Sequence, residues 1–484
     1  MSSEIRRNSK TRNSKTRQKL LDTASLGVLE QAVECLGAGF KNLPAKMVPL
    51  QKADALKEVL LETARLLQDN FPYFHPLYAG QMLKPPHPVA RLAYALALWI
   101  NPNNHALDGG RSSSAMEKEA VAQLAKMFDW KTHIGHLCSG GTMANLEALW
   151  IAGQLAPGKK IVASEQAHYT HRRICQVLKL EFHEVPCDKQ GQLSLPALKS
   201  LLATGNVGTV VATMGTTATG SVDPVEEILA LRAQYGFRLH ADAAYGGYFR
   251  IVPNLEEQTR KNFEGLSEVD SLVIDPHKHG LQPYGCGCVL FRDPQEARFY
   301  KHESPYTYFS SEELHLGEIS LECSRPGAVA VALWATQKLL PLVPGGEFAS
   351  MLSKCRGSAL ALCEKLRSQT GWVTGFKPEL DIVVWAPRAP RATQVSEFSR
   401  RIFAEAGGQN LHLALATLPA RFFELQEAGI ECDAETITCL RSVLMKPEHA
   451  DWLEQIWELL EGARAKACHR QIELPGKGRG DALD

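Results

Sequence analysis

Three short segments carry residue types that could do chemistry together. In residues 271–291, SLVIDPHKHGLQPYGCGCVLF, one lysine, Lys278, stands between two apolar runs. Lysine is rarely buried completely, so an amine between two core segments needs a partner or a chemical role. A dry environment favours the neutral amine, which can form a Schiff base with an aldehyde. The alternative is a lysine with a buried stem whose ammonium group reaches water.

The other two segments offer an anion site and a carboxylate. CSGGTMANLEALW places Gly140, Gly141 and Thr142 at the expected start of a helix, where free N–H groups favour an anion such as phosphate. LHADAAYGGY places Asp242 directly after an apolar run. Taken singly, glycine-rich turns are common, and such an aspartate is more often a helix cap or an ion-pair partner.

Together, the three features match the needs of one cofactor. Pyridoxal phosphate requires a lysine for its aldehyde, an anion site for its phosphate and a carboxylate for its ring nitrogen. Asp242 precedes Lys278 by 36 residues, which leaves room for a helix and a return strand. We therefore expect pyridoxal 5'-phosphate as the cofactor.

The elements that must position these residues alternate in type from Ile134 onwards. Apolar runs such as KIVASE and VGTVVATMG are separated by helical patterns such as PVEEILALRAQYG. Strands alternating with helices predict an α/β fold with a mostly parallel sheet. Ligands of such sheets bind beyond the carboxyl ends of the strands, where all three candidate segments fall.

The chain as a whole divides into five expected parts. They are a disordered basic tail over 1–20, an N-terminal helical segment over 21–85, a cofactor-binding large domain over 86–343, a smaller C-terminal α+β domain over 344–470 and a disordered tail over 471–484. The first tail repeats RNSKT and lacks the apolar stretch of a secretory signal. A transit peptide is the alternative for this tail.

Composition excludes several classes of partner. The chain has 484 residues with 53 basic and 53 acidic side chains, so neither nucleic acid nor an anionic membrane is expected to bind it. No apolar run approaches the roughly 20 residues that span a bilayer. The twelve cysteines form no C-x-x-C pair, which favours a reduced, cytoplasmic setting.

Competing motifs are few. His133-x-x-His136 and His168-x-x-His171 have the spacing of a metal site on a helix. No nearby carboxylate or cysteine completes either set, so we expect no metal. The sequence contains none of three common glycine motifs: the P-loop G-x-x-x-x-G-K-[ST], the dinucleotide-binding G-x-G-x-x-G and the nucleophile elbow G-x-S-x-G.

Five motifs, taken in order, carry a resemblance to a known family. SGGTMANL, SEQAHYTH, TMGTTATGSVDP, HADAAYGG and DPHKHG resemble the group II pyridoxal-phosphate-dependent amino-acid decarboxylases, which include the glutamate, cysteine-sulfinate and aromatic-amino-acid enzymes. The similarity runs from roughly His75 to Arg325, and an ordered set is far more specific than one motif. It implies a large domain of the aspartate-aminotransferase type (fold type I), a smaller C-terminal α+β domain, an N-terminal helical segment and a homodimer.

The resemblance also implies roles for individual residues around the cofactor ring. Lys278 would form the Schiff base and Asp242 would partner the pyridine nitrogen. His168 would stack on the ring and help with proton transfer. Thr217 would contact the ring or its carboxylate partner, and Ala244 would pack against the ring face.

The same resemblance implies a phosphate site. Gly140, Gly141, Thr142 and His277 would hold the phosphate. Asp275 stands where many relatives carry asparagine. Because an anionic side chain would repel a phosphate, we expect Asp275 to point elsewhere.

A loop and three further residues complete the implied site. FYKHESPYTYFSSEELHLGE resembles a mobile loop whose tyrosine donates a proton; Tyr308 matches best and Tyr306 second, with a structural aromatic pair as the alternative. Gln81 and Arg441 resemble substrate contacts, and an arginine suits a carboxylate, although each could equally be a packing residue. Arg325 would approach the phosphate from a neighbouring chain.

The sequence thus predicts decarboxylation of an L-amino acid, most simply an acidic one: glutamate, aspartate or cysteine sulfinate. An aromatic-amino-acid decarboxylase is the first alternative. A carbon–carbon lyase or aldehyde synthase on the same fold is the second, although such a lyase normally has a membrane anchor and such a synthase replaces the loop tyrosine. A non-catalytic cofactor-binding protein is the third, and intact Lys278, Asp242 and His168 argue against it.

Overall fold

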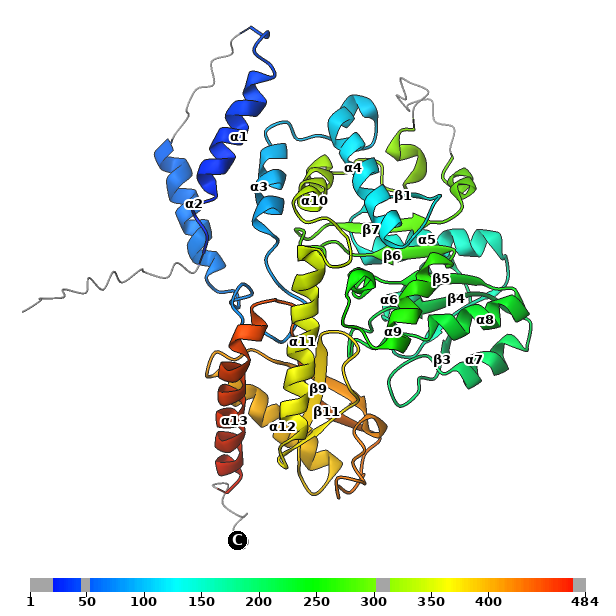
Figure 1. Cartoon of the computed structure of the whole chain (residues 1–484), viewed down its shortest axis with the longest axis vertical. Coiled ribbons are helices and arrows are strands. Elements are labelled where there is room, and N and C mark those ends of the chain that lie inside the picture. The colour runs from blue at the N-terminus through cyan, green and yellow to red at the C-terminus, as the bar shows by residue number, and fades with distance from the viewer. Residues whose placement is uncertain (1–20, 45–52, 302–313, 473–484) are drawn as a thin grey trace, which may run out of the picture. The chain divides into compact units, whose positions relative to one another are not determined.

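The computed structural model describes residues 21–44, 53–301 and 314–472, which form two units (Figure 1). The first unit, up to Met47, holds helix α1 (Leu26–Ala38). The second, from Val48 onwards, holds every other described element. The tail predicted over 1–20 lies outside the described residues.

A seven-stranded sheet forms the centre of the large domain. Across the sheet the strand order is β1-β7-β6-β5-β4-β2-β3, and only β7 runs antiparallel to its neighbours. The predicted α/β class with a mostly parallel sheet is therefore confirmed. The strands are β1 (Ile134–Cys138), β2 (Lys160–Ser164), β3 (Phe182–Val185), β4 (Val207–Thr213), β5 (Arg238–Asp242), β6 (Ser271–Ile274) and β7 (Gly287–Phe291).

Helices cover this sheet, and the strand sequences show why they must. Every residue of β4, β6 and β7 is buried, and runs such as SLVI lack polar alternation, as expected for strands covered on both faces. The helices are α3 (Pro88–Ala97), α4 (Leu107–Met127), α5 (Gly141–Leu155), α6 (Thr170–Leu178), α7 (Leu195–Leu202), α8 (Val225–Tyr235), α9 (Glu257–Glu264) and α10 (Gly327–Leu339). Short 3-10 helices lie at Gly247–Ile251, Gly265–Ser267, Pro294–Phe299 and Leu316–Ile319.

The C-terminal domain is built on an antiparallel sheet of four strands in the order β10-β11-β9-β8. Helix α12 packs on β9 and β11, α13 packs on α11 and α12, and Trp385 of β9 is completely buried in this core. Its elements are α11 (Glu347–Arg367), β8 (Trp372–Thr374), β9 (Ile382–Pro387), α12 (Ala392–Gly407), β10 (Ala414–Pro419), a 3-10 helix at Ala420–Phe422, β11 (Thr436–Val443) and α13 (His449–Ile472).

The N-terminal helices bury nothing within the described chain. Neither α1 nor α2 (Ala53–Leu67) has a buried residue. The aromatic and proline-rich segment that follows α2 is irregular, as its composition predicts, and pairs with the C-terminal domain through Tyr78 and His412. Among the described helices, none is both long and apolar enough to cross a membrane.

One close contact joins strand β7 to the turn that precedes α5. A Cβ atom at Gly287 would lie 2.5 Å from the Cα of Gly140, so any side chain would push the turn away from the strand. Glycine at this position is therefore a requirement of the fold rather than a matter of backbone freedom.

We expect Gly287→Ala to lower the free energy of unfolding by about 1–3 kcal/mol, because the added methyl group overpacks a buried contact. The measurement is denaturant unfolding of the purified protein. Gly357→Ala in α11 is the matched control: no atom lies within 4 Å of its Cβ, and alanine there should stabilise the helix by about 0.5–1 kcal/mol. Equal stability of the two variants would contradict the steric argument.

Candidate active site

A cavity of about 300 Å³ lies at the carboxyl ends of the parallel strands. Its lining comes from the segments that follow β1, β2, β4, β5 and β6. All of the residues predicted to bind a cofactor line it: Gly140, Gly141, Thr142, His168, Thr217, Asp242, Ala244, His277 and Lys278. The structure brings these residues together, and their individual roles remain predictions.

Lys278 is held at the cavity by a buried carboxylate. Its Nζ atom lies 3.0 Å from Oδ2 of Asp275, and its side chain is 23 % exposed. The segment that carries it is tightly constrained: Leu281 has φ of 63°, a backbone conformation that is rare for leucine. The amine therefore has an acidic partner and an opening to the cavity.

The expectation that Asp275 points away from the anion site is wrong. Its carboxylate is buried and lies against Gly141, since a Cβ atom at Gly141 would be 2.7 Å from Asp275 Oδ2. The Lys278 ammonium and the positive end of the α5 dipole offset its charge. Asp275 Oδ1 has no hydrogen-bond partner among the described residues.

Asp242, the last residue of β5, is fixed by two hydrogen bonds. Nε2 of His171 in α6 lies 2.9 Å from Asp242 Oδ2, and the backbone N–H of Ala244 donates to Oδ1 at 3.2 Å. Both His171 and Asp242 are buried. The carboxylate is thereby oriented at the wall of the cavity before any ligand binds.

Electrostatics keep this carboxylate charged. Burial by itself raises the pKa of a carboxyl group. The hydrogen bond from His171 and the nearby positive charges, including that of Lys278, outweigh burial and hold the pKa of Asp242 well below its ordinary value. The site therefore carries a fixed negative charge at neutral pH.

A second buried histidine connects this strand to α5. His240 contacts Ser271 Oγ through Nδ1 and Asn145 Oδ1 through Nε2, each at 2.9 Å, and Asn145 donates to the carbonyl of Gly141. Burial lowers the pKa of His240 to about 3, so its ring is neutral. The first turn of α5 is in this way tied to the strand that ends at Asp242.

Two further histidines line the cavity. His168 Nδ1 lies 2.8 Å from Thr170 Oγ1, and burial lowers its pKa. His277 Nδ1 donates to the carbonyl of Cys286 at 2.8 Å, and burial lowers its pKa as well. Both rings are therefore mostly neutral at pH 7, so each can present a nitrogen to a ligand without adding a full charge.

The predicted substrate residues lie together, but outside the cavity lining. Arg441 Nη1 donates to Gln81 Oε1 at 3.2 Å and to the carbonyl of Gly80 at 3.1 Å. Arg441 Nε and Nη2 donate to the carbonyls of Ala218 and Thr217, at 2.9 and 2.6 Å. This guanidinium, 4 % exposed, thus holds the loop that carries Thr217.

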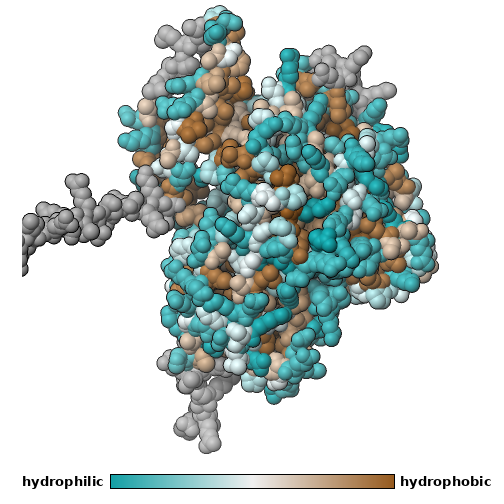
Figure 2. Space-filling view, in the orientation of Figure 1, coloured by the Kyte–Doolittle hydropathy of each residue, from teal (hydrophilic) through white to brown (hydrophobic). Residues whose placement is uncertain are grey.

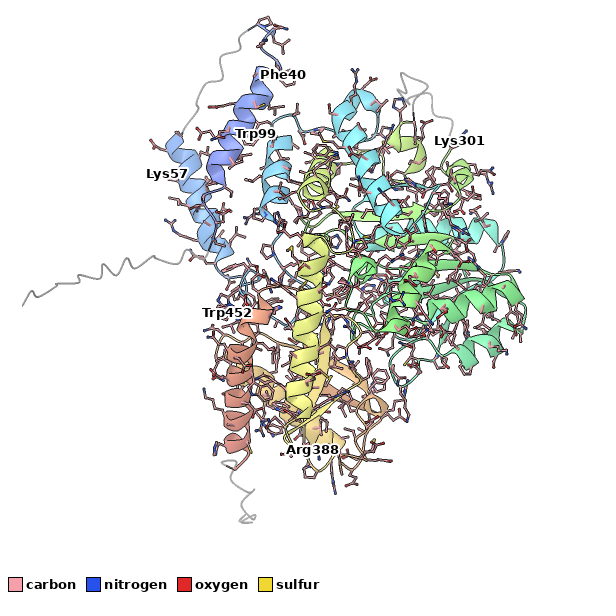
Figure 3. The ribbon with its side chains drawn as sticks, in the orientation of Figure 1. Phe40, Lys57, Trp99, Lys301, Arg388 and Trp452 are labelled. Carbon is pink, nitrogen blue, oxygen red and sulfur yellow. The ribbon has the colours of Figure 1, made fainter. Side chains whose placement is uncertain are left out.

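Arg325 and the two loop tyrosines are not among the described residues that line the cavity. Arg325 is buried and pairs with Glu117 of its own chain at 2.7 Å. This contact does not support the expectation that Arg325 reaches the phosphate of a neighbouring chain. Tyr306 and Tyr308 lie outside the described residues. Lys301, labelled in Figure 3, is the last described residue before them.

Sequence reasoning missed several residues of the site. His171 was visible only as part of a metal-like His-x-x-His pair, whereas the structure turns it towards Asp242. Its spacing of three residues from His168 was the available signal. The lining residues that were missed adjoin predicted positions or strand ends: Ser139, Met143, Asn145, Thr170, Thr213, Gly215 and Tyr245.

The residues suit a ligand with an aldehyde, a phosphate and a basic ring nitrogen. Lys278 offers the amine, and Asp242 offers a charged carboxylate. The first turn of α5 has no side-chain cap, so its N–H groups and the Thr142 hydroxyl can receive an anion. The cavity volume is that of a site for a small molecule. Pyridoxal 5'-phosphate meets all of these requirements.

Known sequences of one enzyme family are similar to this chain. Residues 150–384 match the family model described as the pyridoxal-dependent decarboxylase conserved domain. A probable L-tyrosine/L-aspartate decarboxylase of Methanothermobacter thermautotrophicus is 33% identical over 264 residues, covering 54% of this chain and 70% of the relative. An L-tyrosine decarboxylase of Enterococcus faecium is 25% identical, covering 88% and 91%.

Solved structures share the fold. TDC of Oryza sativa, crystallised with PLP and tryptamine, aligns with a TM-score of 0.73 at 17% identity over 93% of this chain and 99% of that one. Mouse CSAD in apo form aligns with a TM-score of 0.71 at 19% identity over 91% and 99%.

We expect His171→Ala to reduce the free energy of unfolding at neutral pH by about 1–3 kcal/mol, because it leaves Oδ2 of the buried Asp242 carboxylate without its side-chain donor. The lowered pKa of Asp242 stabilises the folded protein above the ordinary value of 3.8, and that contribution is lost as the pH falls towards the folded-state pKa. The difference between variant and wild type should therefore shrink below about pH 4. The measurement is denaturant unfolding across this pH range. The exposed His183→Ala serves as control, and equal losses in both variants would contradict the assignment.

Proposed function

Because the chain belongs to the family of pyridoxal-dependent decarboxylases, we propose that it converts an acidic L-amino acid into the corresponding amine and carbon dioxide. The bound cofactor supplies a conjugated ring that accepts the electron pair left by the departing carboxylate. The observation that carries the proposal is the placement of the Lys278 amine and the charged Asp242 carboxylate in one cavity.

Different residues of the chain bind the cofactor and control its protonation. The first turn of α5, Thr142 and His277 hold the phosphate end of the cofactor. Asp242 holds a proton at the ring nitrogen, and His171 fixes the direction of that carboxylate. His168 covers the ring, where a neutral imidazole can pass a proton without trapping it.

An acidic substrate is supported by the pair of Gln81 and Arg441. Four of the five N–H groups of Arg441 already donate to protein oxygens, and one of these acceptors is the amide oxygen of Gln81. A substrate carboxylate could take the place of that amide oxygen if the exposed Gln81 side chain turned away. Aspartate, glutamate and cysteine sulfinate all carry the required second acid group.

An aromatic substrate is the second candidate. The relatives carry tyrosine in their names, alone or beside aspartate. Among the described lining residues, Lys278 is the one lysine or arginine, so a second substrate acid would find no other full positive charge there. A tyrosine side chain needs none.

We expect the purified protein, loaded with pyridoxal phosphate, to release carbon dioxide from an acidic amino acid and to form the matching amine. Lys278→Ala should lose this activity and the visible absorbance of the bound cofactor, whereas Lys261→Ala, a half-buried lysine outside the cavity lining, should keep both. Gln81→Ala should change the KM for acidic substrates alone.

The alternatives give distinct results in the same assay. Carbon dioxide from tyrosine alone would overturn the acidic preference and leave the reaction class in place. An aldehyde in place of the amine would identify an aldehyde synthase. A coloured protein that released no carbon dioxide from any amino acid would contradict decarboxylation itself.

We propose further that the protein is a homodimer in the cytoplasm. Apolar side chains are exposed along α2 and after α3, and brown patches mark such surfaces in Figure 2. They include Leu56, Val59, Leu60, Leu66, Leu67, Leu98, Ile100 and Trp99, which is labelled in Figure 3. A helix that buries nothing in its own chain is not stable alone, and a second copy offers the same apolar surface in return. All twelve cysteines are unpaired, which suits a reducing compartment.

We expect a dimer in analytical ultracentrifugation, and we expect Leu60→Glu in α2 to shift the equilibrium towards monomer by about tenfold or more, since it places a charge in an apolar interface. Lys57→Glu adds the same acid on the same helix at a polar position and is the control (Figure 3). A wild-type monomer at micromolar concentration would overturn the proposal.

A further inference from the structure

One buried carboxylate of the C-terminal domain faces the cavity walls of the large domain. Asp381 is 0 % exposed and stands immediately before strand β9. Its carbonyl accepts a hydrogen bond of 2.9 Å from the backbone N–H of Leu444, just after β11. The backbone of Asp381 is thus fixed in the C-terminal sheet.

Its side chain reaches two segments of the cofactor cavity. The Tyr245 hydroxyl donates to Asp381 Oδ1 at 2.5 Å, and Tyr245 itself lines the cavity beside Ala244. His279 Nε2 lies 3.2 Å from Asp381 Oδ2, and His279 directly follows Lys278. One carboxylate therefore contacts the segments that follow both β5 and β6.

The neighbouring groups leave this carboxylate charged. Although burial raises the pKa of Asp381, contacts with His279 and Tyr245 and the charge of Lys84 lower it below its ordinary value. Burial lowers the pKa of His279, so that its ring is mostly neutral and does not cancel the negative charge. Arg441 and Cys355 are the other titratable groups that sense Asp381.

We propose that Asp381 is a positioning residue for the cofactor site. Its carboxylate contacts the Tyr245 wall through Oδ1 and the segment that carries Lys278 and His279 through Oδ2, and so holds the two at a fixed separation. The C-terminal sheet thereby takes part in the cofactor chemistry without touching the cofactor. This inference rests on the use of pyridoxal phosphate and not on the identity of the amino-acid substrate.

Two conservative variants alter the contact between Asp381 and Tyr245, one from each side. Asp381→Asn keeps an oxygen that can accept from Tyr245 but removes the negative charge. Tyr245→Phe removes the donor and leaves the charge. Glu296→Gln is the matched control, because Glu296 is also a buried carboxylate, pairs with Arg238 and does not line the cavity.

Two properties of the purified, cofactor-loaded protein are measured without substrate: the dissociation constant of the cofactor and the pH midpoint of its visible absorbance change. Asp381→Asn should weaken cofactor binding about tenfold, because a neutral amide oxygen replaces the charged acceptor of the Tyr245 hydrogen bond and holds the cavity wall less firmly. It should also shift the midpoint by about 0.5–1 pH unit, because a displaced Lys278 segment changes the distance from Nζ to the Asp275 carboxylate.

Tyr245→Phe should weaken cofactor binding to a similar degree and shift the midpoint in the same direction, because it alters the same contact. The double variant should bind the cofactor no more weakly than the weaker single variant, because both changes break one unit. If Asp381→Asn shows the midpoint and the affinity of Glu296→Gln, the role of Asp381 is structural alone and the proposal is overturned. Since no substrate is used, a wrong substrate assignment leaves this test intact.

Discussion

A charged carboxylate at the end of a buried strand is the constraint around which this molecule is arranged. Asp242 stands where β5 leaves the sheet, in surroundings that on their own would neutralise it. The His171 hydrogen bond, 2.9 Å long, and the positive charge of Lys278 keep it ionised. Strand β5 positions Asp242, His171 of α6 orients its carboxylate, and the segment after β6 carries the Lys278 amine. A change in any one of these elements would alter the charge at the cavity wall.

The anion site opposite Asp242 shows a second balance of charge. Asp275 places a carboxylate against Gly141, where a phosphate is expected, and the Lys278 ammonium pairs with it at 3.0 Å. In the proposed arrangement, the uncapped N–H groups of α5 and the neutral His277 would hold the phosphate beside the Asp275 carboxylate. The contact of Gly287 with Gly140 holds that turn in place and leaves no room for adjustment.

Much of the fold was predictable, because buried parallel strands have continuous apolar sequences. The candidate functional residues follow these runs directly. The cavity residues were predictable from their combination, because Lys278, Asp242 and the Gly140 turn each follow an apolar run and together match the needs of one cofactor. The direction of Asp275 was not, since it depends on a compensating amine and helix end that no local pattern reveals. His171 was missed because its partner lies 71 residues away. Arg441 shows the same limit, since its acceptors are backbone carbonyls that the sequence does not display.

The two halves of the site differ in what the chain must supply. Loss of carbon dioxide requires an electron acceptor, which the cofactor supplies, together with an anchored amine and a fixed countercharge, which the strand ends of one domain place in one cavity. In the proposed function, the substrate side chain is selected by Arg441 of the C-terminal sheet and Gln81 of the segment after α2. Arg441 also donates to the carbonyl of Thr217, which lines the cavity. Under that proposal, a substitution of Arg441 would change both substrate choice and the position of the cavity wall.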